Sequence, residues 1–125
     1  MAVVLQTLVD SDFEHVVKLT TSSTNSTASI VDASALAGAD TNPRLSLVAA
    51  RWSVEATTDI LWNANANIIA LSLNGSGAYG GSDGMPSIAN NASTGIDGDV
   101  LITNGASDGY AVLKFRKVSG YDNIT

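Results

Sequence analysis

Apolar and polar residues alternate in short runs along most of this chain, whereas the apolar spacing typical of helices is rare. Successive side chains of a strand point to opposite faces of its sheet, so this alternation predicts strands. In the run FEHVVKLT, one face carries Phe13, His15, Val17 and Leu19. We therefore expect an early strand with one largely apolar face.

The middle of the chain predicts strands close to the core. The run RLSLVAARWSVEA has apolar residues on both faces, as in a central strand. These residues are Leu45, Leu47 and Ala49 on one face and Val48, Ala50, Trp52 and Val54 on the other. The next two runs, DILWNA and NIIALSLN, are separated by a few residues and predict a hairpin. Trp52 and Trp62 are the expected core aromatics.

Three segments predict interruptions of this pattern. The small polar residues of TSSTNST (21–27) favour a loop. Asn42-Pro43 predicts a turn, because proline disfavours the helical conformation of the residue before it. Residues 75–98 hold seven glycines and Pro86 with only scattered apolar residues, and they predict a long irregular excursion at the surface.

Two last strands, DVLITN and YAVLKFRK, are joined by the turn GASDG. In the second, Ala111, Leu113 and Phe115 face one way, and the residues between them face the other. About seven or eight short strands without helices between them predict an all-β fold, either an antiparallel jelly-roll-like sandwich or a small barrel. We expect one domain over residues 1–125, with 1–10 as its first strand or as an N-terminal arm.

Charge and composition limit the classes of molecule that the protein is expected to bind. Twelve acidic residues oppose six basic ones, giving a net charge of -6, and the bases do not form a run that could neutralise phosphates. We therefore expect no nucleic-acid partner. Since no run approaches the about 18 apolar residues that cross a bilayer, we also expect no membrane partner. Charged residues make up 14% of the chain, and the abundant small polar side chains suit contact with protein surfaces.

Two short motifs suggest enzymes, but neither has the context it needs. GSGAYG (75–80) fits the glycine pattern of dinucleotide-binding turns, yet glycines and a proline follow where a helix must begin. GASDG (105–109) fits the pattern around a hydrolase serine, here Ser107, but a strand follows it and the single histidine, His15, lies far upstream. We expect no catalytic residues, no cofactor and no enzyme.

The acidic segment NNASTGIDGD is the best candidate for a metal. Asp97 and Asp99 could offer oxygen ligands to Ca²⁺, although the spacing differs from that of an EF-hand and also fits a tight turn. A lectin-type module is the alternative function, with Tyr79, Asp83 and Asp97 holding a sugar on the 75–98 excursion.

The order of several segments resembles a family of small virion structural proteins of tailed bacteriophages. The resemblance covers most of the chain, and it rests on VVKLT, IVDASAL, ILWNANANIIALSLNGSG, GGSDGMP and GDVLITNGASDGYAVLKFRK. It implies a component of the phage particle, foremost a decoration or cement protein bound to the major capsid protein on the capsid exterior. A tail or head-to-tail role is the alternative within this family.

The same resemblance implies a homo-oligomer, foremost a trimer, made in the cytoplasm of the bacterial host. The start of the chain, AVVLQTLV, lacks the basic leader of a secretory signal and could pair with a sheet edge of a capsid subunit. Six residues are the candidates for contact with the capsid or with neighbouring subunits: Val3, Val4, Leu5, Tyr79, Met85 and Pro86.

Overall fold

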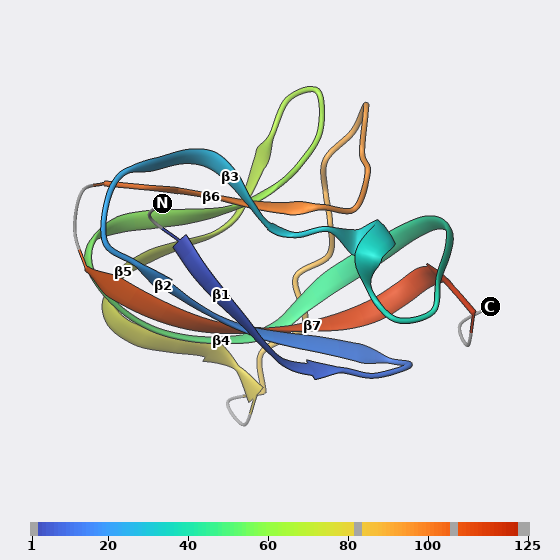
Figure 1. The fold of residues 1–125 in the computed structure, drawn as a ribbon, viewed down its shortest axis with the longest axis horizontal. Helices are drawn as coiled ribbons and strands as arrows, with labels where there is room; N and C mark the ends of the chain where they lie inside the picture. Colours follow the sequence, from blue (N-terminus) through green and yellow to red (C-terminus); the bar gives the residue numbers. More distant parts are fainter. Residues whose placement is uncertain (1–2, 82–83, 106–107, 123–125) are drawn as a thin grey trace.

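A computed structural model describes residues 3–81, 84–105 and 108–122 of the chain. Seven antiparallel strands form one curled sheet, a half-barrel, which confirms the all-β single-domain prediction (Figure 1). The strands are β1 (Val3–Asp10), β2 (Glu14–Thr21), β3 (Asn25–Val31), β4 (Ala39–Trp62), β5 (Ile68–Gly80), β6 (Val100–Asn104) and β7 (Gly109–Tyr121). A short 3-10 turn, η1 (Ala33–Ala35), follows β3.

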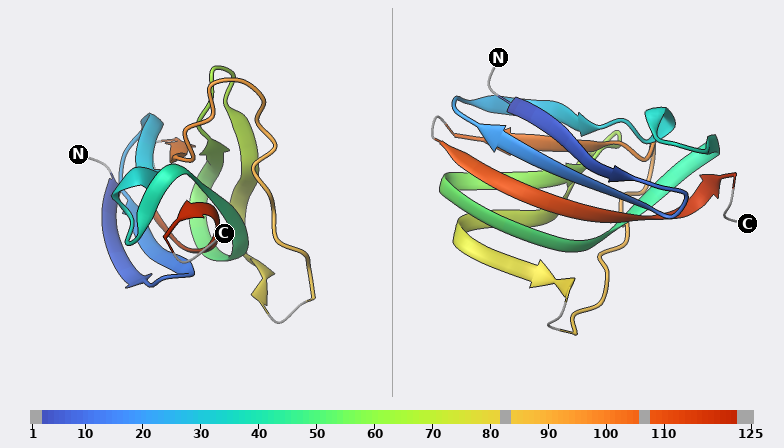
Figure 2. Two further views of the ribbon diagram at one scale, coloured as in Figure 1. Left: turned by 90° about the vertical axis from the view of Figure 1, so that its right-hand side faces the viewer. Right: turned by 60° about the horizontal axis from the view of Figure 1, so that its bottom comes forward.

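The long strand β4 organises the sheet. The strand order is β1-β2-β7-β4-β6-β3, and β5 pairs with the other edge of β4. Residues 39–54 of β4 pair with β7, and residues 58–62 pair with β6, so one strand joins both parts of the curl. In Figure 2 the sheet wraps around its interior as β4 passes from β7 to β6.

The core fills the concave side of this curl. Trp62 and Phe115 meet edge to face there, with ring centroids 6.2 Å apart. On β7, Ala111, Leu113 and Phe115 are buried while Lys114 is exposed, so the predicted alternation is confirmed. The predicted hairpin between DILWNA and NIIALSLN is also confirmed, as the link from β4 to β5.

Several local expectations were wrong. Asn42-Pro43 does not end a strand but lies inside β4, where the pairing with β7 is interrupted and Asn42 has a φ of 53°. Proline is tolerated at such an irregularity because no ladder hydrogen bond is lost. Trp52 is only partly buried and donates from its indole nitrogen to the Asn74 carbonyl (3.2 Å). The loop predicted at 21–27 is shorter, because β3 begins at Asn25.

The irregular excursion also begins later than the sequence predicts. Residues 75–80 belong to β5 and pair with β4, so the excursion starts at residue 81. Farther along, Ile88 bonds back to Leu47 through both backbone groups, at 2.9 and 2.7 Å. This part of the excursion therefore covers the β4 edge beyond the end of β5.

Candidate functional site

The half-barrel is left open between β1 and β3, the first and last strands of the sheet order. Neither strand pairs with the other in the part of the chain that the structure describes, and both lie along the same side of the molecule (Figure 2). A groove of about 230 Å³ separates them. Leu5 and Thr7 line it from β1, and Ile30 and Val31 line it from β3.

Strand β1 is an edge strand with an apolar surface. Among the described strands it pairs with β2 alone, and it leaves four apolar side chains exposed: Val4 (65%), Leu5 (44%), Leu8 (46%) and Val9 (38%). Natural edge strands usually carry charges, prolines or covering loops, because an uncovered edge invites pairing with another chain. The single charged residue of β1 is Asp10, at its end, so residues 3–9 lack this protection.

The register of β1 places its apolar residues on both faces of the sheet. Leu5 pairs with buried Leu19 and faces the groove, whereas Val4 pairs with Thr20 on the outer face. The register then shifts between Thr7 and Val9. A partner strand lying along β1 would therefore meet apolar side chains above and below its backbone, in addition to the backbone hydrogen bonds that strand addition provides.

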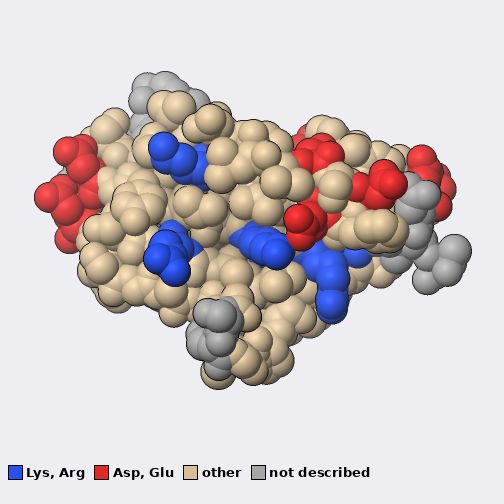
Figure 3. Space-filling view, turned by 90° about the horizontal axis from the view of Figure 1, so that it is seen from below, with Lys and Arg blue, Asp and Glu red and all other residues tan. Residues whose placement is uncertain are grey.

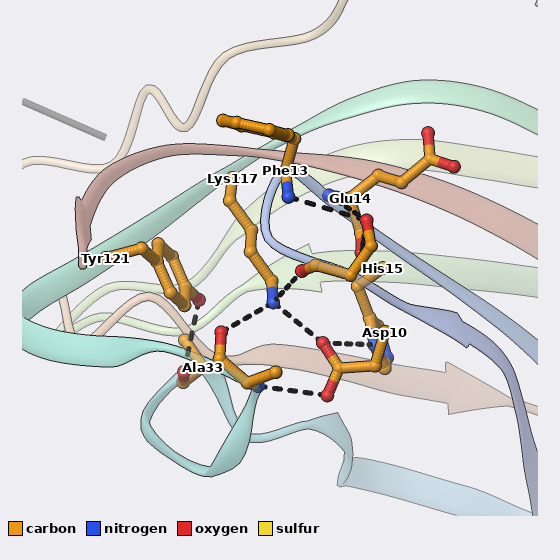
Figure 4. A network of polar contacts seen from close by, with 9 residues as sticks. Asp10, Phe13, Glu14, His15, Ala33, Lys117 and Tyr121 are labelled. Atoms are coloured by element: carbon orange, nitrogen blue, oxygen red, sulfur yellow. Dashed lines mark hydrogen bonds and ion pairs between the residues drawn. The ribbon is translucent and has the colours of Figure 1, made fainter. Parts of the chain in front are cut away.

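Polar contacts around Lys117 fix the end of the β1–β2 hairpin (Figure 4). The Lys117 side chain is fully buried, and its ammonium donates to Asp10 Oδ1 (2.7 Å) and to the carbonyls of Ser11 (2.6 Å) and Ala37 (2.7 Å). The other Asp10 oxygen accepts from the Ala37 N–H (3.0 Å). One lysine thus ties β7, the hairpin and the segment before β4 together, and it holds the exposed edge in place.

This cluster shifts the pKa values of its members. Burial alone would raise the pKa of Asp10, but hydrogen bonds from Lys117 and Ala37 and the nearby positive charge lower it below 3.8. Burial lowers the pKa of His15 below 6.5, although Asp10, 4.0 Å away, opposes the shift. Burial also raises the pKa of Tyr121 to about 12; its hydroxyl donates to the Ala33 carbonyl (3.1 Å), and its ring lies 5.0 Å from Lys117 Nζ.

The six candidate contact residues fall into two separate groups. Val3 is buried, whereas Val4 and Leu5 lie on the exposed edge. The others are far from β1: the Tyr79 hydroxyl donates to the Pro86 carbonyl (2.9 Å), and Met85 beside it is 52% exposed. Three strands, β2, β7 and β4, lie between β1 and β5 in the sheet, so the two groups are separate surfaces.

The two Ca²⁺ candidates act as hydrogen-bond acceptors within the chain. Asp97 accepts from the Asn63 amide (2.7 Å) and from the Asp99 N–H (3.0 Å), and Asp99 accepts from the Ala33 N–H (2.9 Å). Burial raises the pKa of Asp99. No group of three metal-ligating side chains occurs in residues 3–81, 84–105 and 108–122. Asp83 and Ser107 lie outside these residues.

Comparison with known proteins gives no assignment: no family model matches the chain, and no curated protein or solved structure matches it significantly. Within the same described ranges, no helix is long and apolar enough to span a membrane. The candidate site therefore rests on the chain's own geometry. Sequence reasoning missed Leu8, Val9 and Phe13 as exposed apolar residues (46%, 38% and 59%), although the mostly apolar character of AVVLQTLV was the signal for the first two.

Proposed function

We propose that the protein is a non-enzymatic structural component of a tailed-bacteriophage virion, a decoration protein bound to the major capsid protein on the capsid exterior. The observation that carries this proposal is the uncovered apolar edge of β1. An extended segment of a capsid subunit would add to this edge through backbone hydrogen bonds and would place side chains in the groove between β1 and β3. The sequence resemblance is the reason for proposing a phage particle as the partner, and the exposed edge of β1 is the proposed attachment site.

The proposal explains why such an edge can persist. An exposed apolar strand favours aggregation unless a partner covers it, and a regular lattice offers one partner site for each copy. If the protein forms closed oligomers, foremost trimers, several edges engage the lattice together, and avidity strengthens attachment without any single strong contact. A tail or head-to-tail location would use the same edge on another surface.

The first test is a cryo-EM reconstruction of the virion whose genome encodes the chain. We expect density for this half-barrel at regular points of the capsid shell, with a strand of the capsid subunit beside β1. Density confined to the tail would move the protein there. A virion without any such density would refute a structural role.

A binding test isolates the edge itself. Particles lacking the protein are mixed with purified wild-type protein or with the variant Val4→Gln/Leu8→Gln, and bound protein is measured by sedimentation. The variant should bind at least about tenfold more weakly, since each lost apolar contact is worth about 1–2 kcal/mol. Ile69→Gln on β5 is the matched control, because Ile69 is 53% exposed on a different edge. Equal loss in both variants would refute the role of β1.

A further inference from the structure

The exposed basic side chains of this acidic protein gather on one face. Among the six lysines and arginines, Lys117 is buried and Arg44 is partly buried, its guanidinium donating to the Pro43 and Ile96 carbonyls. The other four are exposed: Lys18, Arg51, Lys114 and Arg116. Their strands, β2, β4 and β7, are neighbours in the sheet.

The strand register puts all four on the outer, convex face. Lys18 on β2 and Arg51 on β4 both pair with Val112 of β7, so the three form one row across the sheet. Lys114 and Arg116 follow Val112 at two-residue steps on β7 and share its face. Viewed from below Figure 1, basic side chains form a band across the middle of the molecule, with acidic side chains at both ends (Figure 3).

Most of this positive charge is not neutralised by carboxylates among the described residues. Glu14 lies 3.5 Å from Lys114, and this pair is about half exposed. For Lys18, Arg51 and Arg116, no carboxylate lies within ion-pair distance in the part of the chain that the structure describes. In a protein with a net charge of -6, such a segregated patch would attract negative charge at short range.

Between the bases lies a shallow apolar hollow of about 250 Å³. Val16 and Val112 line it from β2 and β7, Ala49 and Ala78 line it from β4 and β5, and Arg51 and Lys114 also contribute to its lining. The surface of another protein can supply both negative charge and an apolar side chain. Its carboxylates can contact the basic side chains around the hollow while an apolar side chain enters it.

We propose that this basic face docks an acidic protein surface. The inference rests on the proposed function for the identity of the partner, which is the capsid lattice. The chemistry of the contact follows from the charge pattern of the face. The face continues onto the outer side of β1, where Gln6 pairs with Lys18 and Val4 pairs with Thr20. One partner can therefore engage the apolar edge and the basic face together, with charge guiding the approach and fixing the register.

Charge distinguishes this partner from two others. A nucleic acid is a long polyanion, and its phosphates beyond the patch would meet the acidic ends of the same face. A second copy joined face to face by a two-fold axis would place the basic band of one copy over that of the other. A compact acidic patch on a different protein avoids both repulsions.

The test uses NMR titration of the isotopically labelled protein, because amide shifts detect weak binding and locate it. The probe is a poly-L-glutamate peptide of about ten residues at low salt, and the control is poly-L-lysine of the same length. We expect glutamate-induced shifts at Lys18, Arg51, Val112 and Lys114 that disappear as salt is raised. In the variant Arg51→Glu/Lys114→Glu the affinity should fall at least about tenfold. Thermal unfolding verifies that the variant is folded.

The other outcomes overturn the inference. These are the absence of shifts, shifts confined to another surface, tighter binding of a short DNA duplex than of the peptide, and concentration-dependent shifts of the same face in the protein alone. Particle sedimentation then separates this inference from the proposed function. If Arg51→Glu/Lys114→Glu binds the particles as well as the wild-type protein does, the basic face is rejected and the capsid role is kept. Loss of particle binding only in Val4→Gln/Leu8→Gln would likewise reject the basic face and keep the capsid role.

Discussion

Replacing Lys117 by methionine tests the most buried charge of the fold. Methionine keeps most of the apolar stem of the side chain but removes the ammonium, so Asp10 Oδ1 and the carbonyls of Ser11 and Ala37 lose their donor. Strand β7 would then lose its side-chain link to the hairpin and to the segment before β4, while the bond from the Ala37 N–H to Asp10 remains.

The size of the loss follows from two opposing effects. Removing one partner of a buried ion pair costs about 3–5 kcal/mol, because the other charge stays behind without compensation. The Asp10 side chain keeps 27% of its surface exposed and can regain water, so we expect a value near the lower end, about 3 kcal/mol. A chain of this length has a stability of about 6–19 kcal/mol, so the variant should still fold.

Equilibrium urea unfolding measures this change. At a slope of about 2 kcal/mol per molar urea, the Lys117→Met midpoint should fall by about 1.5 M. Lys114→Met on the same strand is the matched control, because that side chain is 45% exposed, and its free energy of unfolding should change by less than about 0.5 kcal/mol. Asp10→Asn and the double variant complete a double-mutant cycle, in which the double variant should be more stable than the sum of the single losses predicts.

Two results would refute this reasoning. If Lys117→Met lost less than about 1 kcal/mol, the three hydrogen bonds would contribute little beyond the cost of burying the ammonium. If the two single variants were simply additive in the double variant, Asp10 and Lys117 would not act as a pair.

Three further predictions concern pH and backbone conformation. Burial lowers the pKa of His15 in the folded state, so the unfolded chain binds a proton first as pH falls. The free energy of unfolding should therefore fall as pH drops below 6.5, and the melting temperature of His15→Gln should lack this part of the pH dependence. Tyr121 has a pKa raised to about 12, so stability should fall as pH rises above 10.0, in step with phenolate absorbance, and Tyr121→Phe should lack this alkaline decline. Gly98→Ala should cost more than Gly84→Ala in urea unfolding: both glycines have positive φ, which costs about 1–2 kcal/mol, but only at Gly98 would the new Cβ collide, with the Pro43 carbonyl oxygen. Equal losses at the two glycines would contradict the collision.

Strand faces could be predicted because burial follows a two-residue period on each side of this sheet. The period placed Val17 and Leu19 of β2 in the core, as the structure confirms. It failed at Phe13, which is 59% exposed because it precedes β2 in the hairpin turn. The same two-residue period, continued from Phe115, also places Lys117 on the buried face, which the sequence-based predictions did not use. Its partner Asp10 could not be identified, since only the folded sheet brings the two together.

The curl and its open side could not be predicted from residue order. Alternation indicates that Val4 and Leu5 belong to a strand, but not whether that strand lies at an edge, which depends on pairings between distant segments. The basic face was missed for a similar reason. Lys18, Arg51 and Lys114 form no run in the sequence, and only the pairing of β2 and β4 with β7 makes them neighbours.

The pairing of β4 with β7 also determines when the protein can fold. Leu47 pairs with Phe115, and Val17 of β2 pairs with Leu113. Strands β2 and β4 therefore cannot complete their pairing until β7, which is synthesised much later, is available. Contacts of such long sequence separation form slowly. While the chain is being synthesised, β4 carries its apolar residues without their final cover until residues 109–121 have left the ribosome. Fragments ending before residue 109 should therefore aggregate rather than fold.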